Sequence, residues 1–514
     1  MEHFEIDKQP GWVRGSRYAL YEPLATSWRL FTLTSSIGGL QLVWSTILSS
    51  GTLFLLSLGF SKSSTALIWS LAPICGTVVQ PYFGMISDQS QNVMGRRKPF
   101  MLGGAIGVSV SLMGLALSES MAVGLLKFLE LDTLSRAAHT MVQGVAVTWF
   151  CFLNIAIQPL QVAGRAFIIE NASAEEQILA HAWASRIQGV GSILGLFLGS
   201  VSLPPILPYG NTMTGFLTLC LLISICLLVT VTMSCVLVEE KCTRGQTSAP
   251  YRGTSLFSRI RDTLVSIKMM PRTIRKVCLV QSFAWMGWFP FLMYHTTYIS
   301  EIHETSDAAH VATAGSRKSN PINMDAVHFG SLAGLLLAVL ALATNCLVPV
   351  LVRAFETAGG DKIKQLLEGS KASELTANSN TIIAFTWVLG HAYFVTAMIL
   401  TFFITSRFAS MLLVASVGIS WAITLWVPYC LVGAVLARRQ RLELDDALEA
   451  GVVMGFHNVA ISAPQIISAV ICSIVFTLCD GTDSGVAWVL RIGGFWTLVA
   501  AYLSWGMVKE MDSL

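Results

Sequence analysis

Four hydrogen-bonding side chains lie at helical spacing in an otherwise apolar segment. They are Asn154, Gln158, Gln161 and Arg165. Spacings of four, three and four residues place them on one face of a helix. Amides and a guanidinium can hydrogen-bond the hydroxyls of a polar ligand. The stripe therefore predicts the lining of a cavity, with a polar seam between packed helices as the alternative.

Other apolar segments carry similar groups. Gln41 and Trp44 are three residues apart, so an amide and an aromatic ring share one helix face. The amide can hydrogen-bond the edge of a sugar, and the ring can pack on its C–H face. Asn458, Ser462 and Gln465 share another face, around Pro464. Tyr294 follows the segment Trp288-Phe289-Pro290. We predict that Gln41, Trp44, Tyr294, Asn458 and Gln465 bind substrate together with the stripe.

One imidazole next to these groups could carry a proton. Among the side chains of its segment, His295 is the one whose unperturbed pKa lies nearest neutrality, so it is a candidate relay, the alternative being a structural histidine.

The elements that position these residues must be membrane helices. Of 514 residues, 54% are hydrophobic and only 12% are charged, about half the charged share of an ordinary water-soluble domain. The apolar runs are too long and too uniform for barrel strands. We predict an all-α protein with twelve spans: 30–55, 65–87, 99–118, 138–162, 178–202, 214–238, 277–299, 328–352, 381–404, 408–436, 451–479 and 486–508.

The spans divide into two six-helix halves. The expected parts are a cytoplasmic N-terminus (1–29), two bundles (30–238 and 277–508), a cytoplasmic central loop (239–276) and a cytoplasmic tail (509–514). With both termini inside, 25 Lys and Arg residues fall on inside segments and 6 on outside loops, which supports this orientation.

Composition and motifs argue against other classes of protein. A net charge of +3 gives no case for nucleic-acid binding. The nine histidines form no close metal-ligand cluster in the sequence, and no phosphate-binding or dinucleotide fingerprint appears. We therefore expect no enzyme, no cofactor and no metal site.

Several segments together resemble a known family. They are Ser35–Trp44, Leu67–Trp69 with Gln80-Pro81, Gly95–Phe100, Arg165–Phe167, Trp288–Phe291 and Asn458–Gln465. In these segments the chain resembles the plant sucrose–proton symporters and fungal α-glucoside permeases, within the glycoside–cation branch of the major facilitator superfamily. The resemblance implies a pseudo-two-fold helical carrier. It also implies conformational gating by the loop that holds Asp88, Gly95, Arg96 and Arg97.

The chain departs from the family at one chemically important position. Family members usually carry an aspartate where this chain has Asn154, eleven residues before the retained Arg165. An asparagine cannot gain and lose a proton near neutral pH. Coupling then moves to His295, Glu170 or Glu301, or transport is uncoupled, or the substrate differs.

Taken together, these features predict a secondary transporter for a disaccharide or α-glucoside of the sucrose or maltose type, coupled to protons. The alternatives are an uncoupled glycoside facilitator and a non-transporting sugar sensor. The expected partners are the sugar, the proton and membrane lipid. We expect a monomer in the plasma membrane rather than the vacuolar membrane.

Overall fold

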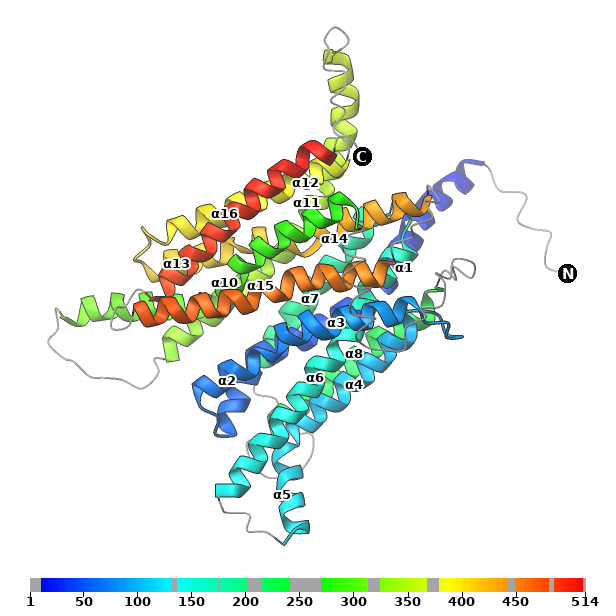
Figure 1. The fold of residues 1–514 in the computed structure, drawn as a ribbon. Coiled ribbons are helices and arrows are strands. Elements are labelled where there is room, and N and C mark those ends of the chain that lie inside the picture. The colour runs from blue at the N-terminus through cyan, green and yellow to red at the C-terminus, as the bar shows by residue number, and fades with distance from the viewer. Residues whose placement is uncertain are drawn as a thin grey trace.

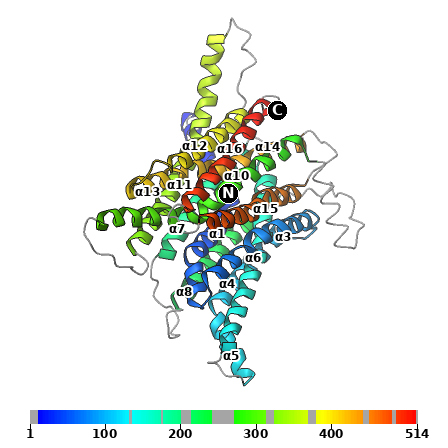
Figure 2. The same ribbon diagram turned by 60° about the vertical axis from the view of Figure 1, so that its left-hand side comes forward.

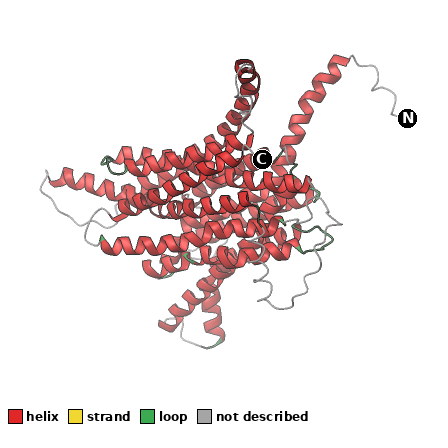
Figure 3. Cartoon of the chain, turned by 45° about the horizontal axis from the view of Figure 1, so that its top comes forward, coloured by secondary structure: helices red, strands yellow, loops and turns green. Residues whose placement is uncertain are grey.

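The computed structural model describes residues 11–130, 136–173, 176–200, 214–240, 270–312, 324–367, 379–441, 449–479 and 485–511. Within these residues the elements are helices joined by turns and loops (Figure 3). The helices before residue 240 are α1 (Gly11–Ser57), α2 (Lys62–Trp69), α3 (Leu71–Asp88), α4 (Lys98–Ala116), α5 (Ser118–Phe128), α6 (Arg136–Asn171), α7 (Gln177–Ser200) and α8 (Thr214–Leu237). Those after residue 270 are α10 (Arg272–Ala312), α11 (Met324–Leu367), α12 (Ser379–Leu400), α13 (Arg407–Ser416), α14 (Gly418–Arg441), α15 (Ala450–Leu478) and α16 (Gly485–Met511).

Each of the twelve predicted spans coincides with helix, which confirms the all-α architecture. Ten described helical segments are long and apolar enough to cross a membrane. The two remaining predicted spans, 65–87 and 178–202, correspond to α2 with α3 and to α7. Both segments carry more polar side chains, and α3 and α7 pack against helices of the other half. Their polarity follows from facing protein rather than lipid.

Several helices extend beyond the predicted spans. Span 138–162 was expected to end before Arg165, whereas α6 continues to Asn171 and keeps Arg165 in the same helix as the rest of the polar stripe. Helix α1 begins at Gly11, within segment 1–29, and the cytoplasmic location of that segment stays a prediction. Spans 277–299 and 328–352 also extend, as α10 and α11. Most of the central loop (241–269) and residues 512–514 of the tail lie outside the described residues.

Two predicted spans are each divided into two helices. The span 65–87 breaks at Ser70, between α2 and α3, and 408–436 breaks at Val417, between α13 and α14. At each break the capping residue keeps right-handed helical φ and ψ, so the chain changes direction only slightly.

Two large apolar clusters hold the helices together. The first is built from residues between Leu30 and Val238. The second uses residues between Met270 and Met507, together with Val162, Ala166 and Ile169 of α6. Helix α6 therefore contributes to both clusters and lies where the two sets of helices meet.

The two sets meet along a few helix pairs. Helix α3 runs beside α15, and α7 packs against α11 and α14 (Figures 1 and 2). Gly84 and Gly451 allow the closest approach between α3 and α15, because a Cβ at Gly84 would overlap the Gly451 carbonyl. The polar residues of interest lie along these contacts.

Candidate substrate site and interhelical ion-pair network

A buried network of charges joins the helix ends near Asp88. We call it the Asp88 network, and its members are Asp88, Arg96, Arg97, Glu170 and Glu449. The side chain of Arg97 is fully buried and donates to Asp88, Glu170 and the hydroxyl of Ser87. Arg96 pairs with Glu170 at 2.7 Å.

The Asp88 network crosses between the two sets of helices. Arg96 of the α3–α4 loop pairs with Glu449, just before α15, at 2.6 Å. The carboxylate of Asp88 accepts from the backbone N–H groups of Gly451 at 3.0 Å and Val452 at 2.6 Å. It therefore caps the N-terminus of α15, where unpaired N–H groups favour a negative charge. The network joins α3, α4 and α6 to α15.

The close approach of the Glu240 carboxylate requires a glycine at position 95. Its φ is +115°, and a Cβ there would overlap the Glu240 side chain. The backbone N–H groups of Arg96 and Arg97 both donate to Glu240 Oε1 at 2.8 Å. This clamp fixes the loop that carries the two arginines.

The surroundings of the Asp88 network favour the charged form of Arg97 and disfavour the charged form of Glu449. Burial alone would lower the pKa of Arg97, but Asp88 and Glu170 raise it above its usual value. Burial and the nearby Asp88 raise the pKa of Glu449 to about 7, against the opposing effect of Arg96. Oxygens of Asp88, Glu170 and Glu449 lie within 4.8 Å of one another. Because the two arginines bind all three, the arrangement is an ion-pair network and not a metal centre.

Further along α3 and α15 lies a neutral polar group, the Asn458 cluster, made of Gln80, Gln161, Asn458 and Ser462. Gln161 Nε2 lies 3.1 Å from Asn458 Oδ1 and 3.5 Å from Gln80 Oε1. Asn458 Nδ2 donates to the Gly76 carbonyl at 3.0 Å and to Ser462 Oγ at 3.1 Å. The absence of a side chain at Gly76 makes room for both groups. This cluster brings Gln161 and Asn458 together, and their role in substrate binding stays a prediction.

A second polar group, the Arg165 cluster, is made of Gln41, Arg165, His181, Gln188, Tyr429 and His457. Arg165 Nη2 donates to Gln188 Oε1 at 3.0 Å, and Gln188 Nε2 donates to Gln41 Oε1 at 2.9 Å. The guanidinium carbon lies 3.9 Å from the centre of the Tyr429 ring. The ring of Tyr429 also neighbours His457 at 4.7 Å and His181 at 6.2 Å.

The charge of Arg165 is incompletely paired. Its side chain is buried, at 7% exposure, and Nη1 has no hydrogen-bond partner. Among the described residues Arg165 forms no ion pair, so no carboxylate there neutralises its charge. A buried charge without a counter-charge is costly and marks a functional site in a membrane protein.

The polar stripe of α6 divides into two parts. Gln161 and Arg165 contact other helices, as described above. Asn154 Nδ2 and Gln158 Nε2 instead donate to the carbonyls of Phe150 and Asn154 in their own helix, at 2.8 and 2.7 Å. Within the described residues their amide oxygens receive no protein donor, so these oxygens are the groups that a ligand could use.

Other predicted site residues lie apart from these clusters. Trp44 packs on the first apolar cluster, Tyr294 meets Phe476 edge-on, and Gln465 donates to the Ile461 carbonyl at 3.1 Å.

The proton-coupling candidates also lie in different places. His295 Nδ1 lies 3.0 Å from the Phe291 carbonyl oxygen, and its ring stacks on Phe291. Glu301 is half-buried in α10. Glu170 belongs to the Asp88 network.

Arg186 of α7 binds a backbone carbonyl of α11 across the interface. Its Nε donates to the Asn345 carbonyl of α11 at 3.2 Å. That carbonyl lies four residues before Pro349, which has no N–H to bond it within the helix. Arg186 therefore replaces the missing helical hydrogen bond from the other set of helices.

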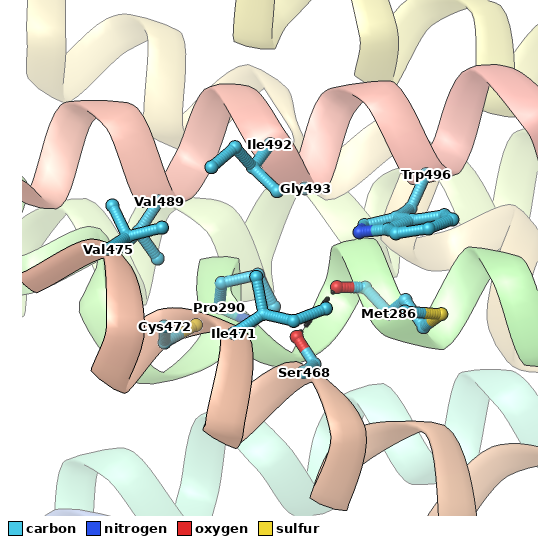
Figure 4. Close-up of a pocket in the computed structure, with 10 residues that line it drawn as sticks. All are labelled: Met286, Pro290, Ser468, Ile471, Cys472, Val475, Val489, Ile492, Gly493 and Trp496. Carbon is cyan, nitrogen blue, oxygen red and sulfur yellow. Dashed lines mark hydrogen bonds between the residues drawn. The ribbon is translucent and has the colours of Figure 1, made fainter. Parts of the chain in front are cut away.

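A narrow crevice between α10, α15 and α16 is a poor match for a sugar (Figure 4). Its lining residues are Met286, Pro290, Ser468, Ile471, Cys472, Val475, Val489, Ile492, Gly493 and Trp496. The hydroxyl of Ser468 already donates to the Met286 carbonyl at 2.9 Å. Mainly apolar walls remain, so the polar clusters are the better candidate site.

Several residues of the site were not predicted. They are Gln80, His181, Gln188, Tyr429 and His457. All of them lie on helices other than α6, so the spacing of the polar stripe on α6 gave no signal for them.

The fold and the polar interface define a major facilitator carrier. A bacterial homologue of the iron transporter ferroportin, solved in an outward-facing state, superposes with a TM-score of 0.57 at 14% identity over 95% of this chain and 99% of that one. The proton:xylose symporter XylE, bound to 6-bromo-6-deoxy-D-glucose, gives 0.54 at 14% identity over 93% and 95%. These similarities establish the fold.

Sequence comparison then gives the family. A family model described as MFS/sugar transport protein matches residues 36–315. The general alpha-glucoside permease of Schizosaccharomyces pombe is 30% identical, over 93% of each chain. Sucrose transport protein SUC3 of Arabidopsis thaliana is 25% identical, over 87% of this chain and 82% of the relative. The chain belongs to the MFS sugar transport protein family, and it is an integral membrane transporter.

Proposed function

We propose that this protein carries α-glucosides such as sucrose or maltose across the membrane by alternating access. The observation that carries the proposal is the Arg165 cluster, a buried guanidinium with an unused N–H at the meeting of the two sets of helices. Sugar hydroxyls offer the oxygen acceptors that this group lacks. The S. pombe relative is named an alpha-glucoside permease and the A. thaliana relative a sucrose transport protein, which supports this class of substrate.

The described conformation corresponds, in this proposal, to a carrier closed at its cytoplasmic end. The Asp88 network joins the two halves there through Arg96–Glu449 and through Asp88 with the start of α15. The distribution of Lys and Arg along the sequence supports the cytoplasmic assignment of that end. Opening toward the cytoplasm then requires Arg96 to separate from Glu449.

Transport in liposomes tests the substrate class. Purified protein would be offered labelled sucrose, maltose, trehalose and glucose, with and without an inward pH gradient. We expect uptake of at least one glycoside, with accumulation above equilibrium only when the gradient is present. Equal uptake with and without the gradient would indicate the uncoupled facilitator. No uptake and no binding of any glycoside would overturn the proposal.

Asn154 offers a separate test of coupling. Its Nδ2 donates to the Phe150 carbonyl, and a carboxyl group can replace that donor only in its protonated form. We expect Asn154→Asp to bind an extra proton, and therefore to increase sugar-induced alkalinisation outside the liposomes. Asn154→Gln, which keeps an amide at this position and cannot ionise, is the control. Unchanged alkalinisation in Asn154→Asp would contradict this prediction.

We further propose that the carrier acts as a monomer in the plasma membrane. We expect a fluorescent fusion of the protein to be seen at the cell edge. We expect the purified protein in detergent to have the mass of one protomer.

A further inference from the structure

His181 is buried without any hydrogen-bond partner. Its side chain has no solvent exposure, and both ring nitrogens lack a partner. Nearly all buried polar groups in proteins are hydrogen-bonded, so an imidazole with neither nitrogen satisfied needs a reason. Packing admits it because α14 has a glycine at Gly433, where an added Cβ would lie 3.0 Å from Nε2.

The groups that face His181 come from several helices. Arg165 of α6 and Tyr429 of α14 are joined by their cation–π contact, and His181 lies beside the same Tyr429 ring. His457 of α15 lies on that ring as well, with Nε2 3.4 Å from Gln281 of α10. Helices α1 and α11 also pack on α7, and among the described residues the titratable groups that act electrostatically on His181 are Arg165 and His457.

The described acidic residues at the end of α6 and the start of α7 are already paired. Glu170 is bound by Arg96 and Arg97, and Glu176 by Arg29. Among the histidines of the interface, His457 has Gln281 and His295 has the Phe291 carbonyl. His181 alone of these three has two free nitrogens, one of which can accept a proton.

We propose that His181 is the proton-binding residue of this carrier, and that the sugar bound at Arg165 stabilises its protonated form. The inference rests on the proposed sugar transport. Protonation turns the free nitrogen into a second N–H donor and adds a positive charge beside Arg165. Without a ligand, neither His181 N–H nor Arg165 Nη1 has an acceptor. Sugar oxygens supply acceptors to both groups, so sugar and proton each strengthen binding of the other.

The position of His181 also suits release of the proton. It lies four residues into α7, and Gln177 at the start of that helix donates to the Ile169 carbonyl at 2.8 Å. One helical turn, about 5.4 Å, therefore separates His181 from the end of the helix near the Asp88 network. When that end opens, the imidazolium gives its proton to water and returns to the neutral form.

His181→Gln tests the proposal, with His391→Gln as the matched control. Glutamine keeps a hydrogen-bond donor but cannot take up a proton. His391 is an equally buried imidazole in α12, beside Ser504 of α16 and remote from Tyr429. The sugar used is the glycoside that the wild type binds most tightly in the transport experiment. Proton uptake on sugar binding is measured in unbuffered detergent solution with a pH-sensitive dye. Thermal unfolding of each variant checks that it is folded.

The wild type and His391→Gln are expected to take up about one proton per sugar bound, and to bind sugar up to about tenfold more weakly per unit rise in pH near neutrality. In His181→Gln both proton uptake and the pH dependence of sugar affinity disappear, while exchange of labelled for unlabelled sugar stays measurable. Proton uptake that persists in His181→Gln would overturn the proposal. So would a wild type that binds sugar without any proton uptake. Failure of the wild type to bind any glycoside would instead remove the proposed function.

Discussion

Arg97 and Arg165 are both buried arginines, but their surroundings differ. Arg97 lies in the Asp88 network, fully buried, with Asp88, Glu170 and Ser87 as partners. Arg165 has one amide acceptor, one aromatic ring, and an Nη1 without a partner. The charge of Arg97 is neutralised by carboxylates of the protein. Arg165 instead keeps an N–H group that is available to a ligand.

This contrast assigns different roles to the two regions. A buried charge that is fully paired stabilises one arrangement of helices, and removing its partner is strongly destabilising. A buried charge that lacks acceptors destabilises the empty state and favours any ligand that supplies them. In the proposed function, the Asp88 network holds one conformation and the Arg165 cluster recognises the ligand.

Replacing Arg97 is expected to have the largest effect. Arg97→Met leaves Asp88 and Glu170 as buried carboxylates with fewer counter-charges, which costs about 3–5 kcal/mol of stability. Thermal unfolding of the purified protein measures the loss. The control is Arg96→Met, since that side chain is 22% exposed and should cost less. Equal losses in the two variants would contradict the assignment of Arg97 as the central ion.

Arg165→Gln should show the opposite pattern. Removing an unpaired buried charge leaves thermal stability unchanged or higher, because no carboxylate loses a partner. Sugar binding should weaken by about 1.5–3 kcal/mol, the usual range for a hydrogen bond to a charged group. Equilibrium binding and thermal unfolding of the same sample measure both quantities. A loss of stability as large as that of Arg97→Met would erase the distinction between the regions.

A smaller effect is expected from pH at Glu449. Its pKa is about 7 in the closed network, because of burial and Asp88, but about 4.3 when the group faces water. The closed state therefore binds the proton more tightly, so acidification favours closure, and this stabilisation is lost as pH rises through 7. Spin labels at the exposed residues Val93 and Gln440 report the separation of the two halves.

The distance between these labels should lengthen on raising the pH from about 5.5 to 8 in the wild type. Glu449→Gln, which stays neutral, should keep the short distance throughout. If the variant follows the wild-type pH profile, another group controls closure.

The smallest expected effect concerns Arg186. Arg186→Met leaves the Asn345 carbonyl without its donor, at a cost of about 1 kcal/mol. Arg186→Lys keeps a donor and serves as the control. Thermal unfolding should rank the wild type and the lysine variant above the methionine variant, and the reverse order would remove Arg186 from the interface contacts.

Sequence alone predicted the helices well and the contacts between them only in part. Apolar runs of about twenty residues identify spans because hydrocarbon excludes unpaired polar groups. The same reasoning ended span 138–162 too early, since it treated Arg165 as a charge outside the membrane. Inside the protein, Gln188 and Tyr429 accommodate that charge.

The candidate site was found where one helix carried several polar residues. The α6 stripe and Asn458 were recognised by their spacing. His181 and Gln188 belong to α7 and Tyr429 belongs to α14, so only the packing of α6, α7 and α14 brings them to Arg165. Hydropathy and periodicity describe one helix at a time and do not contain that information.

The bonds between the halves also bear on how the chain is assembled. Asp88 accepts from the first N–H groups of α15, and Arg186 completes the hydrogen bonding of α11 at Asn345. Both acceptor and donor belong to the part of the chain that is synthesised first. Until the later helices insert beside them, these polar groups of the first bundle lack part of their hydrogen bonding, although Arg97 already binds Asp88. Each half therefore supplies hydrogen-bond partners that the other half needs. Two separately expressed fragments, 1–240 and 241–514, should recover a working carrier only when both are made in the same membrane.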